Sequence, residues 1–385
     1  MKRRWVSLGL SLLGPVSALL ISAILGAFVM LAIGKNPLQV YAVMISYNLG
    51  QLDSIGSIFY RATPLIFSGL AVAIGFKAGL FNIGVEGQYY LGAFFASWAG
   101  VYIKGLPAYI HLPLVILFGI AGGVIWAWLP IYLKVKRGAH EVITTIMMNS
   151  IASAVMLYFI HDVFMDQNQG TLGAPRVRMP PIQPTARMPT MLGFLHAIGI
   201  DMPNYVAINW FLVLAVLAAV AVYYVLWRTP FGYELRAVGQ NPQAAEAAGI
   251  NTKRIQYQAF LLSGAIAGLV GLSDLLTYFG YLDIDFPKGY GFSGIAVALL
   301  ANNNPFGIIL SSLLFGFLER GGLGIQALAG VPREVTTILE GVVILTVVTV
   351  TAIIGRQVRA YERHMAAIAT AAEPPVDTRA PGGGQ

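Results

Sequence analysis

The chain has 385 residues, of which 57% are hydrophobic and only 11% are charged, and its net charge is +7 at pH 7. A soluble domain carries about 25% charged residues, so this composition excludes a soluble globular protein. The positive net charge does not indicate nucleic-acid binding, because Lys and Arg in a membrane protein chiefly set its orientation. The sequence contains no cysteine, which excludes disulfides and cysteine-based metal sites. Its five histidines form no HExxH-type cluster, so we expect no bound metal.

Apolar runs of bilayer length follow one another along the chain, each needing about 20 residues. They are too continuous for the strands of a membrane β-barrel, in which lipid-facing and inward-facing residues alternate. The predicted fold is therefore an all-α polytopic membrane protein with about ten transmembrane helices, some of them short or broken. The expected spans are 6–33, 58–76, 84–103, 110–133, 141–163, 205–227, 256–279, 289–303, 305–322 and 334–355.

Basic residues predict the orientation of these spans. When the ten spans are followed in order, the basic clusters at 134–137 and 356–363 fall on the same side as the basic residues 2–4. The positive-inside rule assigns this side to the cytoplasm, so both termini are expected there. The apolar run after residue 4 is longer than the core of a signal peptide, and no clear cleavage site follows it, so we interpret it as a retained first span.

A proline-rich segment at 164–204 is expected outside the cytoplasm and divides the transmembrane domain, 1–363, into the halves 1–163 and 205–363. Each half contains five expected spans, so the two halves have opposite orientations, as in an inverted repeat. The remaining residues, 364–385, are rich in Ala, Pro and Gly and are expected to form a disordered cytoplasmic tail.

Polar residues interrupt the apolar pattern in "FKAGLFNIGVEGQYYLGA", residues 76–93. Polar groups at membrane depth are costly unless they are paired or face water, and the four glycines allow a broken helix. One interpretation is a backbone break that lines a translocation path, with Phe81, Asn82, Glu86, Gln88 and Tyr89 as candidates. The alternative is a turn between two helices, in which polar groups cap the helix ends.

A second polar pattern lies in "AHEVITTIMMNSIAS", residues 139–153, where polar residues recur every fourth position on one helix face. Such a stripe faces the interior of the bundle or a cavity. Thr145 and Asn149 are therefore path candidates, and hydrogen bonding between helices is the alternative. Glu141 follows a basic cluster closely, so we expect it to form an ion pair.

The expected span 256–279 contains small residues and one acidic residue. The spacing of Gly264 and Gly268 favours close helix packing. Asp274 is a further path candidate, although acidic residues near the ends of spans are usually solvated. The run Asn302 to Pro305 predicts a tight turn before the next span.

The polar stretch "AVGQNPQAAEAAGI", residues 237–250, has the start and stop signals of a short helix over 242–248. Asn241 is a preferred N-cap, Pro242 a preferred first helical residue, and Gly249 a natural terminator. A helix this short is marginal in isolation. It therefore either docks a partner or lies against its own bundle or the lipid surface.

Three motifs resemble one family. "RAVGQNPQAAEAAGI" is similar to the cytoplasmic loop of ATP-binding-cassette (ABC) import permeases of the branched-chain amino acid and simple-sugar type. "FKAGLFNIGVEGQYYLGA" and "HEVITTIMMNSIA" resemble its nucleoside subgroup, usually described as simple-sugar permeases. The resemblance covers residues 55–355 and implies that the short helix is a coupling helix that docks on an ATPase. The residues assigned to this coupling are Glu234, Arg236, Gly239, Asn241, Pro242, Ala245, Glu246 and Gly249.

The resemblance also implies the partners and the location. These are separate ABC ATPase subunits, a second and paralogous permease subunit, an extracytoplasmic solute-binding protein and the lipid of the bacterial inner membrane. The chain has no GxxxxGK[ST] loop, so ATP and Mg²⁺ are expected on the ATPases and no cofactor on this chain. The expected role is import by alternating access, with no catalytic residue.

Nucleosides are the expected solutes, and simple sugars and branched-chain amino acids are the alternatives. An ion-coupled secondary transporter is the alternative of another class, since it would share the inverted repeat and the central polar groups. A channel would differ from an importer in needing no ATP. No paired-aspartate, GxSxG or metal motif supports an intramembrane enzyme.

Overall fold

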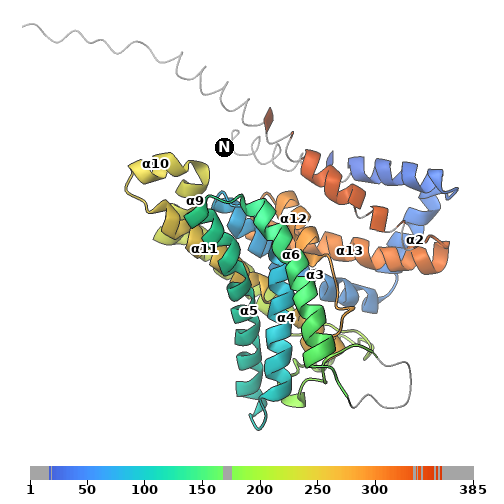
Figure 1. Ribbon diagram of the computed structural model, residues 1–385. Coiled ribbons are helices and arrows are strands. Elements are labelled where there is room, and N and C mark those ends of the chain that lie inside the picture. Colours follow the sequence, from blue (N-terminus) through green and yellow to red (C-terminus); the bar gives the residue numbers. More distant parts are fainter. Residues whose placement is uncertain are drawn as a thin grey trace, which may run out of the picture.

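The computed structural model describes residues 17–18, 20–167, 176–332, 335, 337–339, 341–350, 353 and 356–357. The basic residues 2–4 and the expected disordered tail, 364–385, lie outside this part of the chain. Within it the fold is α-helical, and the β-structure consists of two isolated bridges. The expected all-α fold is confirmed (Figure 1).

The described helices follow the expected spans in order. Five of them, α3, α5, α6 with its continuation η1, α8 and α13, are long and apolar enough to cross a membrane. A helix at Leu20–Ala32 and α2 are bent by 117° relative to each other and would add a sixth span if counted as one. The bounds are α2 (Pro37–Leu49), α3 (Leu52–Lys77), α4 (Val85–Tyr102), α5 (Ala108–Arg137), α6 (Glu141–Tyr158), η1 (Phe159–Val163), η2 (Pro184–Ala186), α7 (Leu192–Ala197), α8 (Phe211–Arg228), α9 (Pro230–Gln240), α10 (Pro242–Ala247), α11 (Thr252–Ala267), η3 (Asp274–Phe279), α12 (Tyr290–Leu300) and α13 (Pro305–Ala329).

The exact number of ten spans is not confirmed, and the differences have local causes. The expected span 256–279 is broken, because α11 ends at Ala267 and the π-helix η3 begins only at Asp274. Between them, the backbone N–H groups of Leu269, Val270 and Leu272 donate to the carbonyls three residues earlier in the chain. Such tighter turns and π-helices interrupt regular α-helix. The expected span 205–227 begins only at Phe211. Short spans were expected, and α12, at the expected span 289–303, has 11 residues. Helix α2 is an element that the apolar pattern did not predict.

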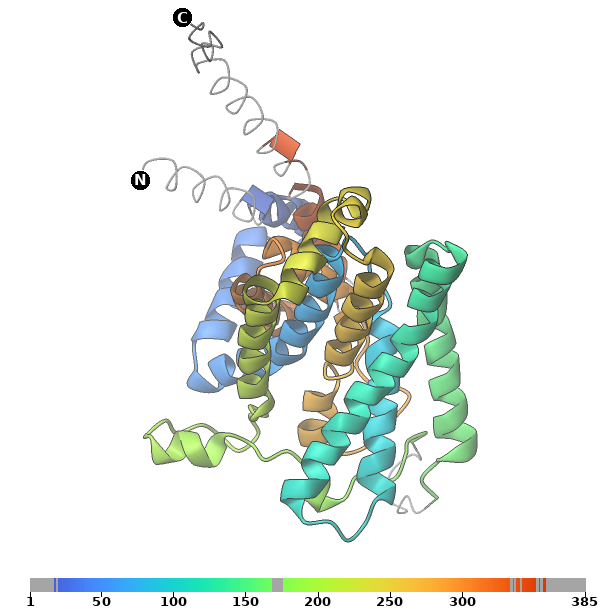
Figure 2. The ribbon, with the colours of Figure 1, turned by 90° about the vertical axis from the view of Figure 1, so that its left-hand side faces the viewer.

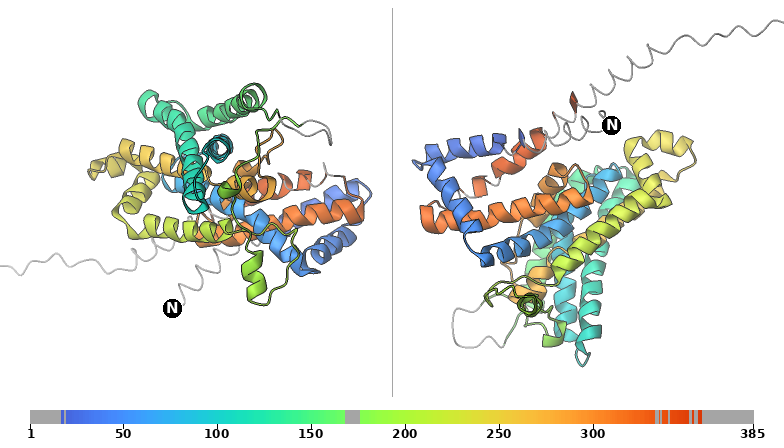
Figure 3. Two further views of the ribbon diagram at one scale, coloured as in Figure 1. Left: turned by 90° about the horizontal axis from the view of Figure 1, so that it is seen from below. Right: turned by 180° about the vertical axis from the view of Figure 1, so that it is seen from behind.

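Helix α3 lies at the centre of the bundle, with α8, α11, α12 and α13 packed against it (Figures 1 and 3). Within its most apolar window, 83% of the residues are buried inside the protein, compared with 28–50% for the other spanning helices. The outer faces of α5, α6 and α8 carry exposed Leu, Ile, Met and Val side chains. In a bilayer these faces lie against lipid, whereas α3 is enclosed by protein.

Glycines bring α4, α5 and α11 into backbone contact. A Cβ atom on Gly264 would lie 2.9 Å from the carbonyl oxygen of Gly123, and one on Gly268 would overlap the carbonyl of Gly119. One on Gly92 would lie 2.7 Å from the Cα of Gly268. The close packing expected from the spacing of Gly264 and Gly268 is confirmed, because only glycine leaves room for this approach.

The turns of the bundle gather at two opposite ends. Figure 2 shows α10 and the 138–140 turn at one end, and the 103–107 turn and α7 at the other. The described part of the proline-rich segment is irregular but attached: the N–H groups of Met179 and Ile182 donate to the carbonyls of Leu282 and Gly280. At 302–304 the expected tight turn is present, with Asn302 and Asn303 at positive φ.

Candidate functional site

A buried amide network joins α3, α11 and the start of α4. The Asn82 side chain donates to Gln88 and to the Ser263 hydroxyl, both at 2.9 Å, and the Ser263 hydroxyl donates to the Ala71 carbonyl at 2.6 Å. The Asn82 oxygen accepts from the Gly84 N–H. Every polar atom of this network has a partner, so it ties the 78–84 turn to the bundle.

Asn149 fastens α6 to the same turn. Its side-chain oxygen accepts from the Gly87 N–H at 2.9 Å, and its side-chain nitrogen donates to the Ile83 carbonyl at 3.0 Å. Thr145, one turn earlier on α6, is fully buried and donates to the Glu141 carbonyl. The ion pair expected for Glu141 is present, with Lys134 Nζ 2.7 Å from its carboxylate. In this conformation the α6 stripe therefore makes contacts between and within helices.

We expect Asn149→Ala to destabilise the folded protein by about 2 kcal/mol, because two buried backbone groups lose their partners. Thermal unfolding of the purified protein in detergent measures the change. Ser150→Ala is the matched control, since Ser150 is the next residue along α6 and is exposed. An unchanged melting temperature with an altered KM for the solute would contradict the structural role and favour a path-lining one.

Glu86 holds the start of α12. Its carboxylate accepts from the backbone N–H groups of Gly289 and Gly291, at 2.7 and 2.8 Å, and from the Tyr90 hydroxyl at 2.9 Å. The Tyr89 hydroxyl lies 3.1 Å from the same carboxylate and donates to the Pro287 carbonyl at 2.8 Å. A Cβ atom on Gly291 would lie 2.5 Å from the Glu86 nitrogen, so only glycine allows this contact. A negative charge here also suits the positive end of the α12 dipole.

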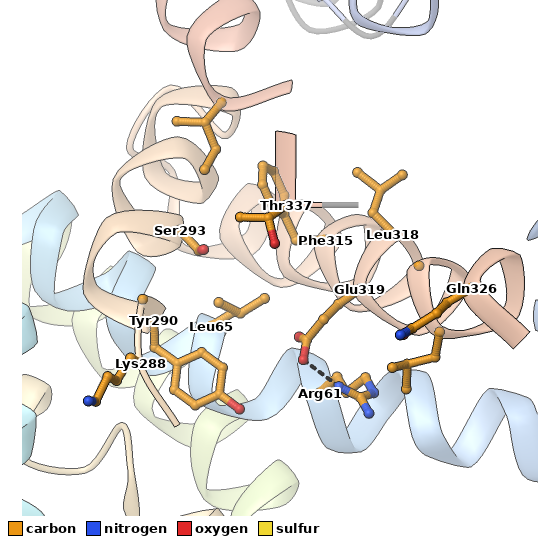
Figure 4. Close-up of a pocket in the computed structure, with 14 residues that line it drawn as sticks. Arg61, Leu65, Lys288, Tyr290, Ser293, Phe315, Leu318, Glu319, Gln326 and Thr337 are labelled. Carbon is orange, nitrogen blue, oxygen red and sulfur yellow. Dashed lines mark hydrogen bonds and ion pairs between the residues drawn. The ribbon is translucent and has the colours of Figure 1, made fainter. Parts of the chain in front are cut away.

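A polar cavity of about 560 Å³ lies between α3, α12 and α13 (Figure 4). Arg61 of α3 forms an ion pair with Glu319 of α13 along its wall, and Tyr290 of α12 lies beside them. The volume is within the range of about 300–1,000 Å³ that is typical of small-molecule sites. The other polar lining residues are Lys288, Ser293, Gln326 and Thr337.

Asp274 stands directly behind this wall. Its carboxylate accepts hydrogen bonds from the Tyr60 hydroxyl and, at 3.0 Å, from the Tyr290 hydroxyl, so it joins η3 to α3 and α12. Asp274 is only 1% exposed, so the expectation of a solvated acidic residue is wrong for this position. The Asp274 carboxylate is instead hydrogen-bonded by two tyrosines, because the side chain points from η3 into the bundle.

Helix α9 is pressed against the α3–α4 turn. A Cβ atom on Gly239 would overlap the Lys77 carbonyl oxygen and would lie 3.0 Å from the Gly79 nitrogen. The Lys77 ammonium lies 5.7 Å from the ring centre of Trp227, and the Arg236 guanidinium lies 5.8 Å from it. Cations at this distance are attracted to the ring face. The segment between α8 and α11 therefore contains two helices, α9 and α10. The sequence predicted only α10, from its capping residues, and α9 was not predicted.

Helix α10 has the caps that the sequence predicted. The Asn241 side chain accepts from the Ala244 N–H at 3.1 Å, Pro242 is the first helical residue, and Gly249 has φ +84°. Ala245 is the buried residue of this helix, and all the others are exposed. The helix therefore contacts its own chain along one narrow line and leaves its other faces open.

The predicted site residues fall into two groups. Of the eight path candidates, none lines the cavity, but Glu86 and Asp274 hydrogen-bond residues that do. Phe81 stacks on Phe76 with ring centres 5.0 Å apart. The coupling candidates lie together on α9, α10 and the residues that cap α10. These placements leave both roles as predictions.

The cavity itself is a feature that was not predicted from the sequence. Arg61 is the single charged residue of the expected span 58–76, and Glu319 lies beside Arg320 inside the expected span 305–322. Charged residues inside a span mark a functional site by default. The two charged residues could therefore have been recognised as site candidates from the sequence. Tyr290 and Ser293 could not, because their place in the cavity depends on where the short helix α12 begins.

Comparison with known proteins identifies the chain. A family model described as "Branched-chain amino acid transport system / permease component" matches residues 54–348. The chain belongs to this permease family. Its permease relatives include the guanosine ABC transporter permease protein NupP of Bacillus subtilis (strain 168), which is 38% identical over 87% of this chain and 92% of its own.

Two further relatives cover most of the permease. The glucose ABC transporter permease protein TsgB13 of Haloferax volcanii is 33% identical over 90% of each chain. The nucleoside ABC transporter permease protein NupB of Lactococcus lactis subsp. cremoris is 32% identical over 86% of this chain and 88% of its own. Family membership makes this chain a multi-pass transport subunit that works with ATPase and solute-binding partners.

Proposed function

We propose that this permease imports nucleosides across a bacterial inner membrane, with both termini in the cytoplasm. It does so with a paralogous second permease subunit, a solute-binding protein on the outer side and ATPase subunits that hold ATP and Mg²⁺. This chain binds no cofactor and performs no covalent chemistry. Transport proceeds by alternating access, in which ATP-driven closure of the ATPases moves α9 and α10.

The observation that carries the proposal is the open face of α10. A helix of six residues with complete caps buries only Ala245 against its own chain, at the end of the molecule where the 138–140 turn also lies (Figure 2). Because such a short helix is marginal without a packing surface, its exposed residues fit a partner. The candidates include Glu246, and Asn241 fixes the start of the helix.

The solute is inferred from the relatives. Guanosine, nucleosides and glucose stand in the names of three relatives that are 32–38% identical. These solutes are uncharged and carry neighbouring hydroxyl groups on a sugar ring. Branched-chain amino acids, which appear in the family description, are zwitterions without such hydroxyls. Two of the three names favour nucleosides, and simple sugars are the alternative.

Named contacts connect α9 to the cavity. Gly239 abuts the 77–79 turn, the amide network of Asn82 follows that turn, and Glu86 then holds the start of α12, which forms a wall of the cavity. Displacement of α9 by an ATPase would be passed along these contacts. Energetic coupling along such a chain needs direct measurement, and ATP-driven uptake by Gly239→Val tests its first contact.

Competition for uptake tests the solute assignment. We expect that vesicles containing the complete transporter accumulate radiolabelled guanosine when ATP is supplied. Excess unlabelled inosine should reduce this uptake strongly, and excess glucose or leucine should leave it unchanged. If leucine or glucose is the better competitor, or is itself the solute accumulated, the nucleoside assignment is wrong.

A further inference from the structure

We propose that the cavity between α3, α12 and α13 is a transit site that holds the solute by two neighbouring hydroxyl groups. Glu319 is the acceptor for these hydroxyls and Arg61 is a donor beside it. This inference rests on the proposed function, because it assumes that an uncharged, hydroxylated solute crosses this permease. It assigns specificity to residues that lie outside the motifs from which the family was inferred.

The depth of the ion pair supports a transport role. Arg61 is the tenth of the 26 residues of α3, and Glu319 is the fifteenth of the 25 residues of α13. Both therefore stand well inside helices that are long enough to span a bilayer. Ionisable side chains at such depth are expensive unless they face a cavity or a partner, and they mark solute or ion pathways.

The ion pair is only partly enclosed. The Arg61 and Glu319 side chains are 25% and 33% exposed, and the cavity is the space that both line. One guanidinium nitrogen of Arg61 contacts one carboxylate oxygen of Glu319. The second carboxylate oxygen and the other guanidinium N–H groups therefore remain available, since a carboxylate accepts up to about four hydrogen bonds and a guanidinium donates five.

Further polar groups surround the pair. Among the described residues, the side chains of Lys288, Ser293 and Gln326 have no hydrogen-bond partner, although all three line the cavity. Leu65 and Phe315 supply an apolar surface on the same wall. A cavity with several free donors and acceptors beside an apolar surface suits a solute with a hydroxylated end and a flat, less polar end, such as a nucleoside.

The chemistry of the pair selects neighbouring hydroxyls over other groups. A carboxylate accepts the ribose hydroxyl of dinucleotides in nucleotide-binding folds. Here the positive charge of Arg61 compensates that of Glu319, so the carboxylate accepts hydrogen bonds from the hydroxyls without attracting a cation. When a solute that lacks both hydroxyls is bound, Glu319 and Arg61 lose water without gaining hydrogen bonds from the solute. Sites built to hydrogen-bond a hydroxyl reject such analogues strongly.

The experiment compares uptake of guanosine and 2′,3′-dideoxyguanosine by the complete transporter, with the same solute-binding protein throughout. Glu319→Gln is expected to lower guanosine uptake about 10-fold or more, because hydrogen bonds to a charged acceptor are lost. Uptake of the dideoxy analogue should be nearly unchanged, so the preference for guanosine should fall. ATP hydrolysis by the assembled complex should persist.

Two additional variants separate recognition from structure. The double variant Arg61→Glu with Glu319→Arg keeps an ion pair between α3 and α13, so it restores uptake if the pair has only a structural role. Ser293→Leu narrows the cavity without touching the pair and is expected to raise the KM for guanosine several-fold. Its control is Ser150→Leu, which places the same side chain on an exposed face of α6.

The outcomes are decisive. Loss of the guanosine preference in Glu319→Gln, with no rescue by the charge exchange and a raised KM in Ser293→Leu, supports the transit site. If Glu319→Gln does not fold, the Ser293→Leu result decides. A wild-type preference in Glu319→Gln, rescue by the charge exchange or an unchanged KM in Ser293→Leu overturns it. If the wild-type transporter does not move guanosine at all, it is the proposed function that fails.

Discussion

Gly239→Val is expected to reduce ATP-driven uptake to background while the protein still inserts into the membrane. Any Cβ atom at position 239 would overlap the carbonyl oxygen of Lys77 and would lie 3.0 Å from the nitrogen of Gly79. Both are backbone atoms and cannot rotate away, so α9 must move off the α3–α4 turn. The caps that form α10 lie beyond this contact and should be kept. The ATPases would then still bind α10, but a movement of α9 and α10 would no longer be passed to the α3–α4 turn.

The measurement is ATP-dependent solute uptake by membrane vesicles, with the amount of inserted permease determined in parallel. Gly193→Val is the control, because a Cβ atom at Gly193 meets nothing within 4 Å and the residue lies on α7 at the opposite end of the molecule. Uptake equal to wild type in Gly239→Val would show that α9 does not transmit force through this contact.

The second large effect is expected for Glu86→Ala. Removal of the carboxylate leaves the N–H groups of Gly289 and Gly291 and the hydroxyl of Tyr90 without their acceptor, inside the bundle. Hydrogen bonds to a charged group contribute about 1.5–3 kcal/mol each, and buried donors left unpaired cost more. We expect a loss of about 4 kcal/mol in the free energy of unfolding.

Thermal unfolding of the purified permease in detergent checks this value. Glu246→Ala removes an exposed carboxylate from α10 and should leave the melting temperature unchanged. Glu86→Gln should fall between wild type and Glu86→Ala, because its amide retains one acceptor oxygen. A melting temperature of Glu86→Ala equal to that of wild type would mean that α12 is held by other contacts.

Local features were predictable from the sequence, and α10 shows why. Its N-cap, its first-turn proline and its terminating glycine lie within a few residues of one another, so the local sequence alone determines where the helix begins and ends. The predicted range 242–248 differs from the observed Pro242–Ala247 by one residue. The close packing of Gly264 and Gly268 against α5 was predictable for the same reason, since the spacing alone places both residues on one face.

Features that depend on packing were not predictable. Asn82, Gln88 and Asn149 are polar at membrane depth whether they line a path or join helices, and only the positions of Ser263, Gly87 and Ile83 show what they bond in this conformation. The cavity brings together α3, α12 and α13, which are more than 200 residues apart at their extremes. The periodicity of apolar residues does not show which distant helices pack together.

The break in the expected span 256–279 has the same origin. Its glycines permit a break but do not require one, and the π-helix η3 is fixed by the hydrogen bonds of Asp274 to Tyr60 and Tyr290. Some short or broken spans were expected, but the apolar runs do not show which span stops inside the bundle and resumes with another geometry.

The central claim is that this permease moves its solute with energy from ATP hydrolysed by other subunits. Proteoliposomes that contain the permease pair, the ATPases and the solute-loaded binding protein test it most directly, with guanosine inside measured over time. We predict uptake that requires ATP, persists when ionophores collapse all ion gradients and disappears in Gly239→Val. Uptake without ATP, or its loss on collapse of an ion gradient, would contradict the claim and indicate a channel or an ion-coupled transporter.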